Sequence, residues 1–92
     1  MWTWDPNKAR INKAKHGVSF EQAERALGDP WAVSYPDPHP DEERWRTIGR
    51  PYADRPTVLF VVHTDHPIDG GSGRIITARR ATPAERKHYE KG

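Results

Sequence analysis

One apolar run limits the folds that this chain of 92 residues can adopt. Residues 57–64 read TVLFVVHT, and nearly every side chain in the run is β-branched or apolar. Such a run is typical of a strand that is buried on both faces of a sheet. Its fully apolar part, residues 58–62, is far too short to span a membrane. We therefore expect residues 57–63 to form the central strand of a sheet.

Three more segments are predicted to join this sheet. Residues 31–35 alternate as WAVSY, residues 42–48 read EERWRTI, and residues 74–80 read RIITARR. The proline-rich stretch 36–41 is predicted to be a loop that no strand enters. Short connections favour an antiparallel meander. Residues 2–4 form either a short strand or a segment packed under the first helix.

The first predicted helix, residues 6–15, has capping signals but no apolar face. Asp5 can accept hydrogen bonds at its start, and Gly17 tolerates the left-handed conformation that ends helices. One face carries a single aliphatic residue among polar ones: Lys8, Ile11, Asn12 and Lys15. Apolar burial therefore cannot be what mainly holds this helix, and the face is either solvated or presents cations to a partner.

Two further helices complete the prediction. Ser19 and Gln22 form a capping box for residues 20–27, whose apolar side packs on the core. Residues 83–91 have a strong start signal but few apolar side chains, so this helix is expected to be weak, surface-lying or partner-dependent. The order describes a small α+β fold in a single domain, residues 1–92: two N-terminal helices, a four-stranded antiparallel sheet and a C-terminal helix.

Both ends of the chain are basic, although the net charge is only +2. Residues 1–16 carry four lysines or arginines and one acid, and residues 74–92 carry six and two. If folding brings these ends together, they form a cationic surface that attracts nucleic acid or an acidic protein. The absence of cysteine suits a reducing compartment, and no signal peptide is visible.

Lys15 and His16 are adjacent at the end of the first helix, where the helix dipole favours positive charge. A pair of cations there suits a phosphate ligand, and a histidine, with an ordinary pKa of about 6.5, can move a proton near neutrality. The alternative is that Lys15 is solvated and His16 only caps the helix.

Arginines on the predicted strands offer a second set of phosphate ligands: Arg44, Arg46, Arg79 and Arg80. A guanidinium fork matches phosphate geometry and stays charged, although such residues are often solvated or ion-paired instead. We expect Arg44 and Arg79 to project towards Lys15 and His16 and to converge with them on one phosphate. Tyr89 is either the anchor of the last helix or a hydroxyl in the site.

Metal binding is the weaker possibility. His63, Asp65 and His66 follow the central strand, and His39 lies between two aspartates, but their spacing fits no well-marked ligand pattern. We therefore predict neither a metal nor a cofactor.

Several segments, in order, resemble one protein family. They are WDPNKARINKAKHGVSFEQA from residue 4, Asp29-Pro30, Glu43-Arg44 with Ile48-Gly49, and RIITAR from residue 74 followed by Thr82, Glu85, Arg86 and Tyr89. Together they resemble the BrnT toxins, the ribonuclease halves of bacterial type II toxin–antitoxin modules, which have a RelE-like fold. Two departures are Thr77, where the family usually has serine, and a longer loop at residues 64–73.

The resemblance implies a cytoplasmic endoribonuclease that inhibits translation until a BrnA-like antitoxin covers it, with operator DNA bound only through the antitoxin. Lys15, His16, Arg44 and Arg79 match the family's motifs and are the expected catalytic residues. The residues expected to bind RNA around them are Lys8, Asn12, Arg46, Arg80 and Tyr89. The alternatives are a non-catalytic cationic module that binds RNA or an acidic protein, and a metal-dependent nuclease that uses His63, Asp65 and His66.

Overall fold

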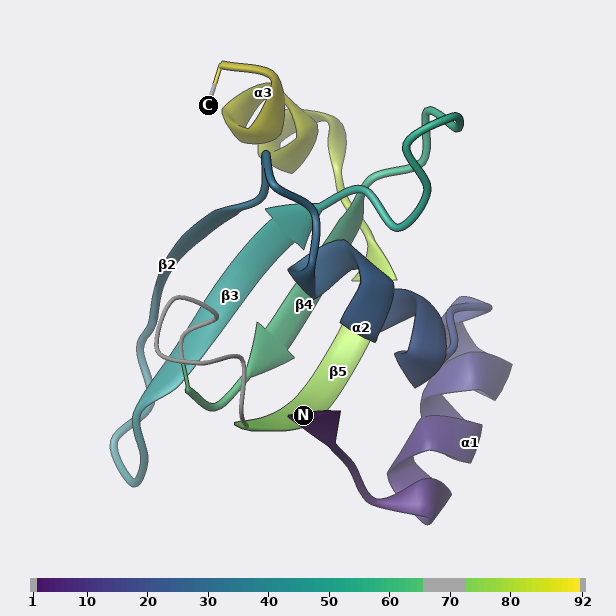
Figure 1. Ribbon diagram of the computed structural model, residues 1–92. Coiled ribbons are helices and arrows are strands. Elements are labelled where there is room, and N and C mark those ends of the chain that lie inside the picture. The colour runs from purple at the N-terminus through teal and green to yellow at the C-terminus, as the bar shows by residue number, and fades with distance from the viewer. Residues whose placement is uncertain (1, 66–72, 92) are drawn as a thin grey trace.

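The computed structural model describes residues 2–65 and 73–91. Five strands form one mixed sheet in the order β1-β5-β4-β3-β2 (Figure 1). The strands are β1 Trp2–Thr3, β2 Val33–Asp37, β3 Arg44–Gly49, β4 Leu59–His63 and β5 Gly73–Arg80. The helices are α1 Pro6–His16, α2 Phe20–Leu27 and α3 Pro83–Lys91. The small α+β fold, its three helices and the central position of β4 are thereby confirmed.

Two details of the predicted sheet are wrong. The sheet has a fifth strand, β1, which pairs parallel with β5, so the sheet is mixed rather than purely antiparallel. In addition, β2 extends through Pro36 to Asp37, where a loop was expected. Because β2 is an edge strand with β3 as its one neighbour, a proline that lacks an N–H donor is tolerated there.

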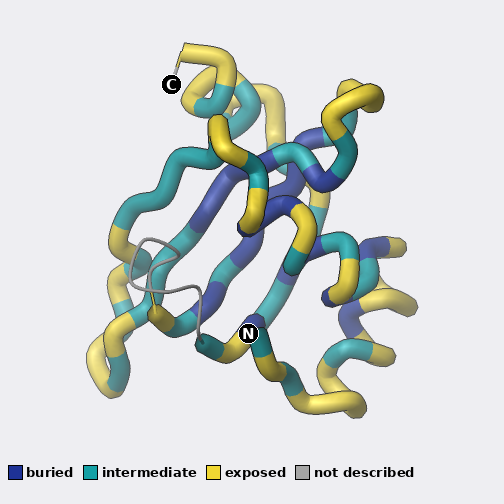
Figure 2. Tube along the Cα trace, viewed as in Figure 1, coloured by how far each residue is buried: buried dark blue, intermediate teal, exposed yellow. Residues whose placement is uncertain are grey.

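Two apolar clusters lie on opposite faces of the sheet. The larger one joins α2 to the sheet through Phe20, Ala23 and Ala26, which pack with Val61 and Ile75. The smaller one is built on the other face around Ile48, Val58 and Phe60, and Tyr89 of α3 packs against it. Figure 2 shows that the buried positions follow the central strands, while α3 and α1 remain largely exposed.

Helix α1 is attached to the sheet by an amide rather than by an apolar face. Ile11 is 60% exposed, and the buried residue of α1 is Asn12. The Asn12 Nδ2 donates to the Ala78 carbonyl at 2.9 Å and to the Val18 carbonyl at 3.0 Å, and its Oδ1 accepts from the Ala78 N–H at 3.2 Å. The side chain thus satisfies backbone groups of β5 that β4 does not, and it fixes the position of α1.

Replacing Asn12 is therefore expected to destabilise the fold. Asn12→Ala leaves the buried Ala78 N–H and carbonyl without partners, which costs about 1–3 kcal/mol in the free energy of unfolding. Urea denaturation followed by tryptophan fluorescence measures the change. The matched control is Asn7→Ala in the same helix, where the side chain is exposed and the expected change is within about 0.5 kcal/mol. Equal stability of the two variants would contradict this account of α1.

Candidate functional site

Lys15 and His16 lie at the C-terminal end of α1, beside β5. The helix ends there because Gly17 adopts the left-handed conformation, with φ of +72°, and its N–H donates to the Lys13 carbonyl at 2.8 Å. A hollow of about 340 Å³ at this place, here called the helix-end hollow, is lined by Lys8, Asn12, Lys15, His16, Ile76 and Thr77. Four of the predicted site residues are thus gathered in one place, although the amide of Asn12 is already engaged by the backbone.

Arg79 is near this hollow but is held by an ion pair. Register places Arg79 opposite Phe60 and Thr77 opposite Val62, so Arg79 and the hollow-lining Thr77 share one face of β5, about 7 Å apart. The Arg79 guanidinium lies 4.2 Å from the Phe60 ring centroid and donates to both carboxylate oxygens of Glu85, at 2.8 and 2.9 Å.

This ion pair keeps both of its groups charged. The hydrogen bond to Glu85 raises the pKa of Arg79. Partial burial alone would raise the pKa of the Glu85 carboxyl, but hydrogen bonds from Arg79 and from the Thr82 backbone outweigh burial, and the pKa is lowered. The pair therefore orients a permanently cationic fork over the Phe60 ring, two residues along β5 from the hollow-lining Thr77.

Arg44 lies on β3, two strands away from β5 and the hollow beside it. Its Nε donates to Glu42 at 2.7 Å, and Arg74 binds the same carboxylate at 3.0 Å. Ile48 on β3 pairs with Phe60 on β4, and Phe60 pairs with Arg79 on β5, so Ile48 is level with Arg79. Arg44 is four residues away from Ile48 along β3. Arg44 and Arg79 are therefore separated by about 13 Å along the strand direction and by about 10 Å across two strands. The expectation that Arg44 and Arg79 converge on one phosphate is therefore not met, because the antiparallel register separates them.

The remaining predicted residues are distributed over the surface. Arg46 stacks over the Tyr35 ring at 4.9 Å, on the same sheet face as Arg44. Arg80 is exposed and lines a hollow of about 150 Å³ beside Gly17. Tyr89 packs against the Ile48 cluster, as the anchor interpretation expected, and its hydroxyl lines a different pocket.

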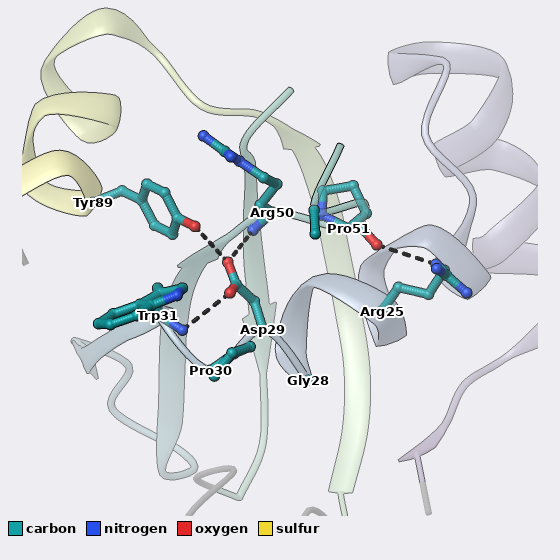
Figure 3. A pocket seen from close by; sticks show the side chains of 9 residues that line it. Arg25, Gly28, Asp29, Pro30, Trp31, Arg50, Pro51 and Tyr89 are labelled. Atoms are coloured by element: carbon teal, nitrogen blue, oxygen red, sulfur yellow. Dashed lines mark hydrogen bonds between the residues drawn. The ribbon is translucent and has the colours of Figure 1, made fainter. Parts of the chain in front are cut away.

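That pocket is organised by Asp29 (Figure 3). The Asp29 Oδ2 accepts from the Tyr89 hydroxyl at 2.7 Å and from the Arg50 N–H at 2.8 Å, and Oδ1 accepts from the Trp31 N–H at 3.0 Å. Burial would raise the pKa of Asp29, but these hydrogen bonds outweigh it and the pKa is lowered. Burial has the larger effect in raising the pKa of Tyr89, and the hydrogen bond that its hydroxyl donates to Asp29 raises this pKa further. Sequence reasoning noted Asp29-Pro30 only as part of a resemblance and missed Trp31 and Arg50.

His63 is part of the core. It is fully buried, its Nδ1 lies 2.8 Å from the Thr64 carbonyl, and its Nε2 lies 2.7 Å from the Thr47 hydroxyl. Residues 2–65 and 73–91 contain no group of three His, Asp or Glu side chains placed to hold a metal ion. His66, the third member of the alternative metal set, lies outside the described residues.

Comparison with known proteins identifies the family. Residues 4–85 match the family model described as the ribonuclease toxin BrnT of a type II toxin–antitoxin system. The chain belongs to the BrnT family. The crystal structure of the Brucella abortus ribonuclease toxin BrnT superposes with a TM-score of 0.57 at 25% identity, covering 89% of this chain and 97% of that one. A search of curated proteins finds no match.

BrnT membership confirms the resemblance that the sequence motifs indicated. As a ribonuclease toxin of a type II module, the chain has RNA as its substrate and an antitoxin as its partner. Within the described part of the chain, no helix is both long enough and apolar enough to cross a membrane.

The Asp29 hydrogen bonds predict a pH-dependent contribution to stability. Asp29→Asn replaces an acceptor oxygen with an NH₂ group and is expected to cost about 1–3 kcal/mol at pH 7. Because the pKa of Asp29 is lower in the folded state than its ordinary 3.8, this contribution is complete above about pH 4–5 and is lost as pH falls through the folded pKa. Urea denaturation across pH 3–7 measures it, with the exposed Asp54→Asn as control. A difference between parent and Asp29→Asn that stays constant down to pH 3 would exclude this role.

Proposed function

We propose that this BrnT chain cleaves RNA without a metal ion, at the helix-end hollow, using the substrate's own 2′-hydroxyl as the nucleophile. The observation that carries the proposal is the position of Lys15 and His16 together at an open, cationic hollow, with Arg79 two residues along β5 from the hollow-lining Thr77. RNA is a polyanion, and such a hollow attracts its phosphates.

The reaction requires two proton movements and charge stabilisation. The 2′-hydroxyl loses its proton and its oxygen attacks the adjacent phosphorus, while the bond from phosphorus to the 5′-oxygen breaks and that oxygen gains a proton. The products are a 2′,3′-cyclic phosphate and a free 5′-hydroxyl. In this proposal Lys15 and His16 remove and return the protons.

Arg79 supplies the charge that the pentacoordinate phosphorane needs. Its side chain is one-third exposed, and Glu85 fixes the orientation of its guanidinium. A donor that is oriented before the reaction stabilises developing negative charge without further reorganisation. Arg44 and Arg46, which lie on β3 two strands away from Arg79, are assigned to holding the RNA backbone rather than to the reacting phosphate.

The antitoxin in this proposal is BrnA-like and covers the cationic surface, and contact with operator DNA is made through the antitoxin. The proposed location is the cytoplasm, where the RNA substrate and the antitoxin are found together. A neighbouring reading frame for a small acidic protein would support this assignment, because an acidic chain complements the cationic hollow.

Cleavage assays on purified protein in the presence of a chelator test the proposal. His16→Ala is expected to lower the cleavage rate by about 10²-fold or more, and Arg79→Ala by about 10²–10³-fold; Lys15→Ala is expected to lower it as well. The matched control is Arg10→Ala, which removes one positive charge from the same helix without lining the hollow. A substrate with 2′-deoxyribose throughout should remain intact.

Three results would contradict the proposal. Cutting that stops when metal is chelated would favour a metal-dependent nuclease. Salt-sensitive RNA binding without any fragments would favour the non-catalytic binding module. Unchanged cutting by correctly folded Lys15→Ala, His16→Ala and Arg79→Ala would place the reaction elsewhere on the molecule.

A further inference from the structure

The helix-end hollow and two other hollows in this molecule are lined by basic residues. The second hollow, about 150 Å³, begins at Gly17, the residue directly after His16. Pro51 lines both this middle hollow and the third, the pocket that Asp29 organises, whose volume is about 520 Å³. The middle and third hollows therefore adjoin at Pro51, whereas the helix-end hollow is separated from the middle one by the turn at Gly17, because Thr77 and Arg80 lie on opposite faces of β5. The three hollows are together called the track.

The track is strongly basic. Lys8 and Lys15 line its first part, Arg55 and Arg80 its middle, and Arg25 and Arg50 its last. Among the described residues that line it, the one acid is Asp29, whose two oxygens already accept three hydrogen bonds. A ligand that extends along the track therefore meets positive charge throughout its length, as a nucleic-acid backbone requires.

The last pocket also presents an aromatic surface. Trp31 is 76% exposed, although its backbone N–H is fixed by Asp29. Figure 3 shows Trp31 and Tyr89 together on one side of this pocket and Arg25 on the other. The Arg25 Nε donates to the Pro51 carbonyl at 3.1 Å, which orients its fork, and the Arg50 guanidinium lies 5.8 Å from the Tyr89 ring centroid. An exposed indole in a pocket that two guanidinium-bearing residues also line is the chemistry that binds unpaired bases and their phosphates.

We propose that this tryptophan pocket is an RNA subsite that stacks one unpaired base on Trp31 and binds the flanking phosphates through Arg25 and Arg50. The inference rests on the proposed function, because the track starts at the hollow where cleavage is placed. Its volume lies within the range of about 300–1,000 Å³ found for ligand pockets. Basic residues in all three hollows, together with a single acid among the described residues that line them, whose oxygens are already hydrogen-bonded, favour an RNA strand over a protein partner.

A binding measurement with an RNA that cannot be cut tests the subsite. The probe is a single-stranded 2′-O-methyl oligonucleotide of about ten nucleotides, within the usual site sizes for single strands, and fluorescence anisotropy gives its Kd. Trp31→Ala is expected to raise the Kd about tenfold, since base stacking on an aromatic side chain has an effect of this order. Trp31→Phe is the matched control and should retain most of the affinity. Arg50→Gln should weaken binding and reduce its salt dependence by about one ion.

The outcomes separate this inference from the proposed function. If Trp31→Ala binds the oligonucleotide as tightly as the parent, the subsite is excluded, while loss of cutting in His16→Ala would leave the cleavage site standing. If Trp31→Ala keeps its RNA affinity but loses affinity for the antitoxin, the pocket belongs to the protein partner and the inference is overturned. If the parent protein itself binds no RNA, the proposed function fails together with the subsite.

Discussion

The amide of Asn12 is the contact on which the arrangement of this molecule depends. An α1 helix with no apolar face would not remain on a sheet by hydrophobic burial alone: Ile11 is mostly exposed, and the small side chain of Ala9 is the one that packs against the core. Asn12 instead donates to and accepts from the Ala78 backbone, as a neighbouring strand would do. The position of Lys15 and His16 relative to β5 follows directly, because both are within one turn of that amide.

The same principle of polar pairing recurs across the basic surface. Glu85 holds Arg79, Glu42 holds Arg44, and Asp29 gathers Trp31, Arg50 and Tyr89 through three hydrogen bonds. Glu85 and Glu42 each neutralise part of a cationic face and fix the direction of an arginine fork, whereas Asp29 holds two backbone N–H groups and the Tyr89 hydroxyl. Arg79 and Arg44 are therefore already oriented, and in the proposed function this orientation lowers the cost of binding RNA.

Local sequence signals were sufficient to predict the helices and the central strand. They did not predict which strands pair, because that pairing joins residues far apart in the sequence. The caps at Asp5, Ser19 and Gly17 and the apolar run of β4 are readable because they depend on near neighbours in the sequence. The parallel pairing of β1 with β5 joins residues about seventy positions apart, and no turn signal marks it. The separation of Arg44 from Arg79 depends on strand register, which a list of strand residues leaves open. Asn12 was predicted only as a polar residue of α1 that binds RNA, and its anchoring role was missed, since its partner Ala78 is 66 positions away in sequence.

The central claim is that the reacting phosphate lies at the end of α1. It is tested most directly by a crystal structure of the protein with an RNA oligonucleotide that carries a 2′-deoxyribose at the mapped cleavage position. The account predicts that the phosphate following this sugar contacts Lys15 or His16 and lies within reach of the Arg79 guanidinium. A phosphate bound instead between Arg44 and Arg74 at the other end of the sheet, with the helix-end hollow empty, would contradict the account.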